Sequence, residues 1–158
     1  MNHPAMRRKD RVLEEHELDQ ILANGEWGVL ATVSPDGSPY CLPISYVAQS
    51  EIIYLHCAPR GRKLDNMLQN DRVCFTVTGD THILPDQFTT LYESVIAFGR
   101  AQLIEDPAEK TAALLLMSQK YSPQYLDEAE RYIERSLHKT AIIKITVEYI
   151  TGKANKKL

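Results

Sequence analysis

The chain has 158 residues, which is the length of one domain and enough to bury a substantial core. Its 44% hydrophobic and 25% charged residues are typical of globular proteins and exclude a disordered chain. A formal net charge of −3 at pH 7 gives no general attraction to nucleic acids or acidic membranes, and no apolar run reaches the ~20 residues that span a bilayer.

The first part of the chain is predicted to form a helix followed by a β-hairpin. Residues 14–24 place their apolar side chains on one helical face and end at a glycine, which predicts a short helix. Residues 27–34 and 40–47 are rich in β-forming residues and flank a Ser-Pro-Asp-Gly-Ser turn, so they are predicted to be paired strands. Pro43 cannot donate a ladder hydrogen bond, which indicates an edge, a bulge or a position approached by another group.

The rest of the chain adds further strands and an inserted pair of helices. Strands are predicted at 51–57, 72–78, 89–104 and 140–150, helices at 62–68, 107–121 and 124–137, and an irregular polar stretch at 79–87. Most strands follow one another without the helical crossover that parallel pairs require, so we expect an antiparallel β-barrel with attached helices. We expect one domain over residues 1–158, with segments 1–12 and 154–158 peripheral and a polar tail from Gly152.

The cysteines and the N-terminus predict a cytoplasmic protein. Cys41, Cys57 and Cys74 are odd in number and form no CxxC pair, so neither a disulfide framework nor a zinc ribbon is expected. Each lies in a strand-like run and is expected to be a small buried side chain. The basic residues near the N-terminus are not followed by the apolar segment of a secretory signal.

The common catalytic motifs do not occur in the sequence. It contains no GxSxG, HExxH, Walker or GxGxxG motif, and the five histidines have no metal-ligand spacing. Hydrolase, zinc-protease, P-loop and Rossmann functions are therefore unsupported, and no metal site is expected.

One segment suggests a phosphate site. A predicted strand leads through a loop containing Gly61 into a helix that begins with Arg62 and Lys63. Helix N-termini carry unpaired N–H groups and a partial positive charge, so two cations are unfavourable there unless an anion lies between them. A phosphate would satisfy the N–H groups and both side chains, whereas the alternative is that both side chains simply point into solvent.

Seven short motifs carry a resemblance to a known family, and they occur in family order over about residues 10 to 153. They are Gly28-Val-Leu-Ala-Thr32, Pro39-Tyr-Cys-Leu-Pro-Ile-Ser-Tyr46, Ile53-Tyr-Leu-His-Cys-Ala58, Gly61-Arg-Lys-Leu64, Asn70-Asp-Arg-Val-Cys-Phe75, Tyr92-Glu-Ser-Val-Ile-Ala-Phe-Gly99 and Ile150-Thr-Gly-Lys153. The chain resembles the FMN-binding split barrels of the pyridoxamine 5'-phosphate oxidase-like superfamily, and most closely the 5-nitroimidazole resistance (Nim-type) branch. The resemblance implies a six-stranded antiparallel split β-barrel.

The same resemblance implies the residues that hold FMN. It places Arg62 and Lys63 on the phosphate, and His56 and Cys57 beside the ribityl chain or ring. It places four further residues along the flavin ring: Leu42, Pro43, Ile44 and Ser45. Ser94 matches a position at which the oxidase branch has a flavin-contacting glutamine. The family binds FMN at a two-fold interface, which implies a homodimer with two equivalent sites.

His56 and Trp27 each have a functional and a structural interpretation. The histidine that matches His56 in the Nim-type branch lies near the flavin and the substrate, so His56 is the catalytic candidate. The alternative is a strand-end histidine hydrogen-bonded in the core. Trp27 could cover the flavin ring, but packing in the core is the expectation for a single Trp at the start of a strand.

The resemblance implies an FMN-dependent oxidoreductase that passes electrons from a nicotinamide donor to a small organic acceptor, such as a nitroaromatic. The alternative is a non-catalytic barrel that stores or senses flavin, deazaflavin or haem, with His56 or Cys57 as a haem ligand. A nucleic-acid-binding barrel is disfavoured by the negative charge and by the expected burial of Tyr40, Tyr46 and Tyr54.

Overall fold

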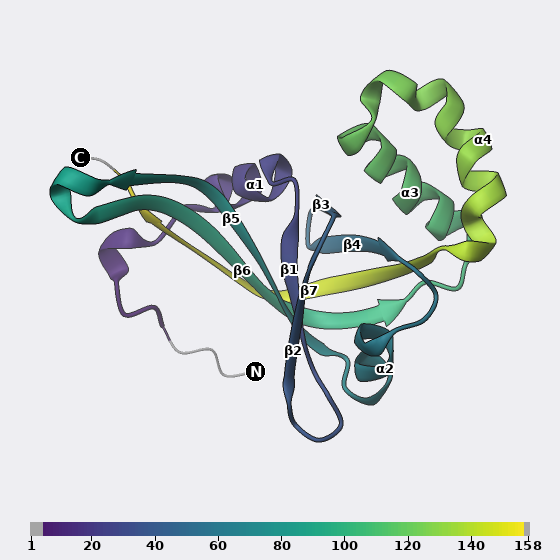
Figure 1. The fold of residues 1–158 in the computed structure, drawn as a ribbon, viewed down its shortest axis with the longest axis horizontal. Helices are drawn as coiled ribbons and strands as arrows, with labels where there is room; N and C mark the ends of the chain where they lie inside the picture. Colours follow the sequence, from purple (N-terminus) through teal and green to yellow (C-terminus); the bar gives the residue numbers. More distant parts are fainter. Residues whose placement is uncertain (1–4, 157–158) are drawn as a thin grey trace.

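The computed structural model describes residues 5–156, which form one antiparallel sheet with helices packed around it (Figure 1). The strand order across the sheet is β2-β1-β5-β6-β7-β4-β3. The strands are β1 (Gly28–Val33), β2 (Pro39–Ile44), β3 (Tyr46–Gln49), β4 (Ile52–Cys57), β5 (Arg72–Leu84), β6 (Thr89–Leu103) and β7 (Ala141–Asn155). The α-helices are α1 (Glu15–Asn24), α2 (Arg62–Gln69), α3 (Pro107–Tyr121) and α4 (Leu126–Ser136). No helix within residues 5–156 is long and apolar enough to cross a bilayer.

The predicted class, mainly β with attached helices, is confirmed, but the predicted number of six strands is wrong. Residues 40–47 were predicted to be one strand and instead form parts of β2 and β3, which lie at opposite edges of the sheet. β2 pairs with β1 up to Ile44, and β3 begins to pair with β4 at Tyr46. Only Ser45 separates them, so the sheet is curled until its two edges meet at this residue.

The side chain of Tyr121, the last residue of α3, fixes this crossover. Its hydroxyl accepts a hydrogen bond from the Tyr46 N–H (2.9 Å) and lies 2.7 Å from the carbonyl oxygens of both Tyr46 and Glu26, to either of which it can donate. Burial raises the pKa of Tyr121, so the phenol keeps its proton. The helix is thereby tied to the backbone at the point where the chain changes edges.

Two apolar clusters fill the two sides of the sheet. The larger one packs α1 against the inner face and includes Leu30, Phe75 and Ile145, all of them buried. The smaller one lies under α3 on the outer face and contains Val47 and Met117. The α3–α4 hairpin therefore covers the β3–β4 end of the sheet, while the β5–β6 hairpin extends from the opposite end (Figure 1).

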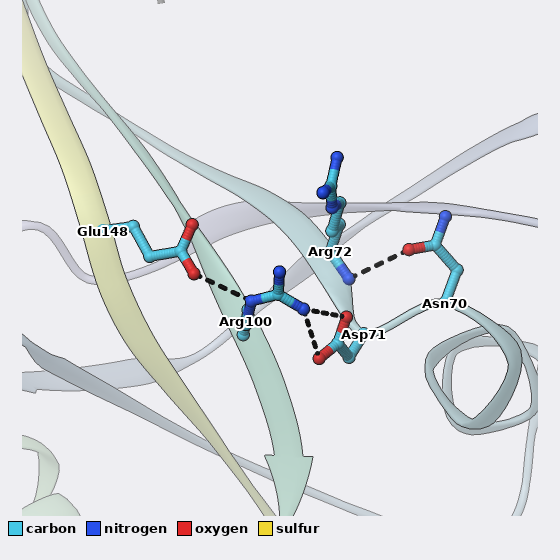
Figure 2. Close-up of polar contacts among 5 residues, drawn as sticks. All are labelled: Asn70, Asp71, Arg72, Arg100 and Glu148. Carbon is cyan, nitrogen blue, oxygen red and sulfur yellow. Dashed lines mark hydrogen bonds and ion pairs between the residues drawn. The ribbon is translucent and has the colours of Figure 1, made fainter. Parts of the chain in front are cut away.

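A bulge and an ion cluster mark the bend of the sheet. The β6–β7 register shifts between Phe98 and Gly99, which leaves Glu148 as an extra residue on β7. Arg100 of β6 donates to Glu148 of β7 (2.8 Å) and to both oxygens of Asp71 (2.9 Å), the residue just before β5 (Figure 2). Such exposed ion pairs contribute about 0–1 kcal/mol each, so this cluster mainly orients the bulge.

The predicted ends of two strands are wrong, because pairing with neighbouring strands makes both of them longer than their sequence patterns indicate. β5 continues to Leu84 through the predicted polar stretch 79–87, because it pairs with the long β6 strand. β7 reaches Asn155 rather than 150, so the first part of the predicted tail is strand and Ala154 is buried. The predicted peripheral residues 1–4 and 157–158 lie outside the described residues.

Two side chains that were expected to be buried lie at the surface. Trp27, which directly precedes β1, is 57% exposed, so it does not pack in the core. Cys41 is exposed on the outer face of β2, while Cys57 and Cys74 are half-buried.

We expect Gly99→Ala to destabilise the protein by about 2–3 kcal/mol, because its Cβ would overlap rigid backbone at the bulge. That Cβ would lie 2.1 Å from the Thr146 carbonyl oxygen. Gly37→Ala is the control: it has open space and only a φ of +83°, so a loss of about 1 kcal/mol is expected. Urea unfolding measures both variants, and equal losses would contradict the close packing at the bulge.

We expect Lys120 to make the stability depend on pH. Burial lowers the pKa of Lys120 from 10.5 to about 8 because it removes water from the ammonium. The remaining contacts of the ammonium, with the Tyr46 ring (3.8 Å to its centre) and the Leu22 carbonyl oxygen (3.4 Å), favour the charged form and offset only part of this loss. The folded state therefore favours the neutral amine, and the stability relative to Lys120→Met rises between pH 8 and 10.5, by about 2 kcal/mol after allowance for partial exposure. Below pH 8 the difference stays constant.

Denaturation at pH 7, 8.5 and 10 measures this difference. Lys139→Met, at an exposed lysine after α4, controls for the loss of a positive charge. A stability difference between wild type and Lys120→Met that does not change with pH would show that Lys120 titrates normally.

Candidate functional site

The N-terminus of α2 is shaped to present backbone N–H groups. Gly61 immediately precedes the helix with φ +135°, a conformation that side chains other than glycine rarely adopt. Its carbonyl accepts hydrogen bonds from Leu64 (2.8 Å) and Asp65 (3.2 Å), while no side-chain cap occupies the first turn. The first N–H groups of α2 are therefore available to an anion.

Arg62 and Lys63 extend from this turn in different directions. The Arg62 guanidinium donates to the Ser34 hydroxyl (2.9 and 3.2 Å) and lies 4.7 Å from the ring centre of Tyr40. Lys63 is half-buried beside Cys57, where its ammonium opposes the effect of burial, which raises the pKa of the Cys57 thiol. Within residues 5–156 neither cation forms an ion pair with a carboxylate.

A polar contact buried beneath the helix holds this turn in place. Asn66 is buried and donates to the Thr32 hydroxyl (2.9 Å), one helical turn after the Arg62–Ser34 contact. Both contacts anchor α2 to the end of β1. Sequence reasoning missed Ser34, Thr32 and Asn66, although the four-residue spacing of Arg62 and Asn66 signals a shared polar face on α2.

The residues predicted to lie along the flavin ring, 42–45, begin with side chains that alternate between the two faces of β2. Leu42 and Ile44 are half-buried and pack against the core, whereas Pro43 is exposed on the outer face of β2. β2 is an edge strand, which is one of the three possibilities that Pro43 left open, so the backbone groups along its free edge have no strand partner in the sheet. The segment ends at Ser45, the crossover residue.

Ser45 and His56 line a common pocket of about 420 Å³ between the sheet and the α3–α4 hairpin. The β3–β4 pairing of Tyr46 with Leu55 brings them together across adjacent strands. His56 is accessible to solvent, but partial burial of the imidazole lowers its pKa below the usual value, so it is neutral at pH 7. The interpretation of His56 as a hydrogen-bonded core residue is not supported by this position.

The structure does not bring Ser94 to the same place as Arg62 and Lys63. Ser94 pairs with Thr78, which lies two residues beyond the Thr76–Val29 pair, whereas Ser34 lies five residues from Val29 in the other direction. At about 3.3 Å per residue these positions are roughly 23 Å apart along the strands. Within one protomer Ser94 therefore lies well away from the Arg62–Lys63 turn.

The residues around α2 fit an FMN phosphate. Two cations without carboxylate partners and free helix N–H groups match a dianionic phosphate. Within residues 5–156 no group of three or more His, Cys, Asp or Glu side chains is placed to hold a metal ion.

Solved structures share this fold. A protein from Bacteroides thetaiotaomicron whose name proposes a role in 5-nitroimidazole antibiotic resistance is 24% identical, with 92% of this chain and 90% of that chain covered at a TM-score of 0.73. A conserved hypothetical protein from Mycobacterium tuberculosis is 22% identical, with 95% and 90% covered at a TM-score of 0.81. An FAD and haem binding protein from Mycobacterium smegmatis is 17% identical, with 91% and 72% covered at a TM-score of 0.79.

A match between the sequence and a family model assigns the chain to a family. A search of curated proteins finds no match to the chain. The family model for pyridoxamine 5'-phosphate oxidase matches residues 14–154, which include the α2 turn, β2 and the paired strands of the sheet. The chain belongs to the pyridoxamine 5'-phosphate oxidase family.

Proposed function

We propose that this protein binds FMN along the free edge of β2, with the phosphate at the N-terminus of α2. Arg62 and Lys63 flank the phosphate at the N-terminus of α2, and the flavin ring lies along the free edge of β2 towards Ser45. The observation that carries this proposal is the α2 turn, where two cations without a carboxylate partner among the described residues flank free N–H groups.

With FMN in this position, the protein is an oxidoreductase that takes electrons from a nicotinamide donor and passes them to a small organic acceptor. The flavin supplies the electron-transfer chemistry, while the protein binds and orients the reactants. His56, a neutral imidazole at the strand end, faces the pocket in which the acceptor binds and can exchange a proton with it. The name of the relative from B. thetaiotaomicron supports a nitroaromatic acceptor, and the relative from M. smegmatis supports a flavin.

The outer face of the sheet supports a homodimer. Val29 and Ile96 are half-buried and Val33 is 38% exposed on this face, beside the exposed Cys41 and Pro43. A second copy that packs here would cover these apolar groups. A two-fold axis would also bring Ser94 of one protomer towards the flavin of the other, which explains why Ser94 lies far from Arg62 within one chain.

A cytoplasmic location agrees with the free cysteines. Cys41, Cys57 and Cys74 form no disulfide with one another. Such thiols persist in the reducing conditions of the cytoplasm.

We expect the purified protein to bind FMN and the Arg62→Ala/Lys63→Ala variant to bind it at least about 100-fold more weakly, because each charged hydrogen bond contributes about 1.5–3 kcal/mol. Flavin absorption and fluorescence titration measure the affinity. The matched control is Arg60→Ala/Arg72→Ala, which removes two exposed positive charges close to the site in sequence but outside the α2 turn.

An equal loss of affinity in both double variants would mean that the general charge, rather than the α2 turn, binds the phosphate. Mass spectrometry of the released ligand distinguishes FMN from a deazaflavin. A colourless protein that refuses added FMN, or a haem Soret band that depends on His56, would overturn the FMN proposal.

We expect Ile96→Asp to weaken the dimer at least about 100-fold, because it would bury an unpaired carboxylate in the interface. Sedimentation equilibrium measures the dissociation constant. Leu68→Asp, at a 74% exposed position on α2, is the control and is expected to leave the dimer intact. A wild-type protein that sediments as a monomer would refute the interface.

A further inference from the structure

The pocket beside His56 is lined partly by α3 and α4, which carry none of the proposed FMN-binding residues. α3 and α4 contribute Leu114, Met117 and Ile133 as its apolar floor. Met117 and Ile133 are only 5% and 3% exposed, so the core holds this floor rigidly. A volume of about 420 Å³ is suited to a small molecule rather than to a polypeptide.

No side chain lining this pocket is charged. The polar lining residues are serines, a threonine, tyrosines and His56, whose imidazole is neutral at pH 7. A charged ligand that leaves water for such a pocket loses solvation without gaining an ion pair. Pyridoxamine 5'-phosphate, which gives the family its name, carries both a phosphate and an ammonium group and therefore does not match this lining.

Three hydroxyl groups of the pocket, on Ser118, Ser136 and Thr140, are arranged as hydrogen-bond acceptors. Ser118 donates its proton to the Leu114 carbonyl (3.0 Å), and Ser136 donates to the Tyr132 carbonyl (2.8 Å). Thr140 donates in the same way to the Ser136 carbonyl (3.0 Å). Because each hydroxyl has given its only proton to the backbone, its free lone pairs can accept from a ligand N–H or O–H group.

Two tyrosines supply aromatic surface to the same pocket. Tyr132 on α4 is 68% exposed, an unusual position for a large ring. Tyr121 has its hydroxyl committed to the backbone at the crossover, so only its ring is offered to a ligand. A planar ligand can stack on such rings with favourable dispersion and quadrupole contacts.

We propose that this pocket binds an uncharged aromatic or heteroaromatic molecule that carries N–H or O–H donors, with Tyr132, Ser118 and Ser136 as its specificity-determining residues. The further statement that this molecule is the electron acceptor rests on the proposed flavin function. The binding itself depends only on the pocket.

Calorimetry with three matched probes at pH 7 tests the ligand class. 4-Hydroxybenzamide is uncharged and carries donors, 4-hydroxybenzoate has nearly the same shape with a negative charge, and methyl 4-methoxybenzoate is uncharged without donors. We expect 4-hydroxybenzamide to bind at least about tenfold more tightly than either of the others, and pyridoxamine 5'-phosphate to show no binding at millimolar concentration.

Two variants and a control locate the binding. Tyr132→Ala and Ser118→Ala/Ser136→Ala are expected to weaken 4-hydroxybenzamide binding at least about fivefold, since each removes part of the lining without disturbing the core. Tyr125→Ala is the matched control, because Tyr125 is 60% exposed next to α4 but does not line the pocket. Equal effects at Tyr125 and Tyr132, tighter binding of the carboxylate, or no binding of 4-hydroxybenzamide at millimolar concentration would overturn the proposal.

Probe affinity is measured with and without FMN, and also in the Arg62→Ala/Lys63→Ala variant. These measurements test the pocket proposal separately from the proposed flavin function. Retained probe binding in that variant shows that the pocket acts independently of the phosphate turn. Loss of flavin binding together with intact probe binding would remove the redox function and leave the pocket proposal standing.

Discussion

The crossover at Ser45 is the constraint on which the rest of the structure depends. Two strands that are consecutive in the chain lie at opposite edges of a seven-stranded sheet, with one residue between them. A single residue spans only about 3.5 Å, so the edges must meet and the sheet must curl. Tyr121 holds this point: its hydroxyl accepts from the Tyr46 N–H, directly after the change of edge, and can donate to the carbonyl oxygen of Glu26, just before β1.

The same crossover positions the proposed cofactor site, because it leaves β2 as an edge strand that ends next to Ser45. Near the start of β2, Arg62 contacts Ser34 and Tyr40, while Lys63 lies beside Cys57 at the end of β4. Among the described residues neither cation pairs with a carboxylate, which leaves their charge to be neutralised by a ligand.

The helices cover only part of the outer face of the same sheet. α3 and α4 cover the β3–β4 end and line the uncharged pocket beside His56. The face over β1, β2, β5 and β6 remains partly exposed, which suits the proposed second copy of the chain. Ser45 and His56 line the pocket and are also among the residues proposed to contact the flavin, so the two proposed ligands would lie close together.

The sequence by itself determined the elements whose signals are local: the Ser34–Ser38 hairpin turn, the helix that begins at Arg62 and the helix over 107–121. Only the tertiary structure decided the change of partner at Ser45, the extension of β5 to Leu84, the exposure of Trp27 and the separation of Ser94 from Arg62. Likewise, the meeting of Tyr121 with Tyr46, 75 residues apart, has no local signal. The physical reason is that alternating hydrophobicity records which side of a strand faces the core, whereas the identity of the neighbouring strand depends on how the whole sheet closes.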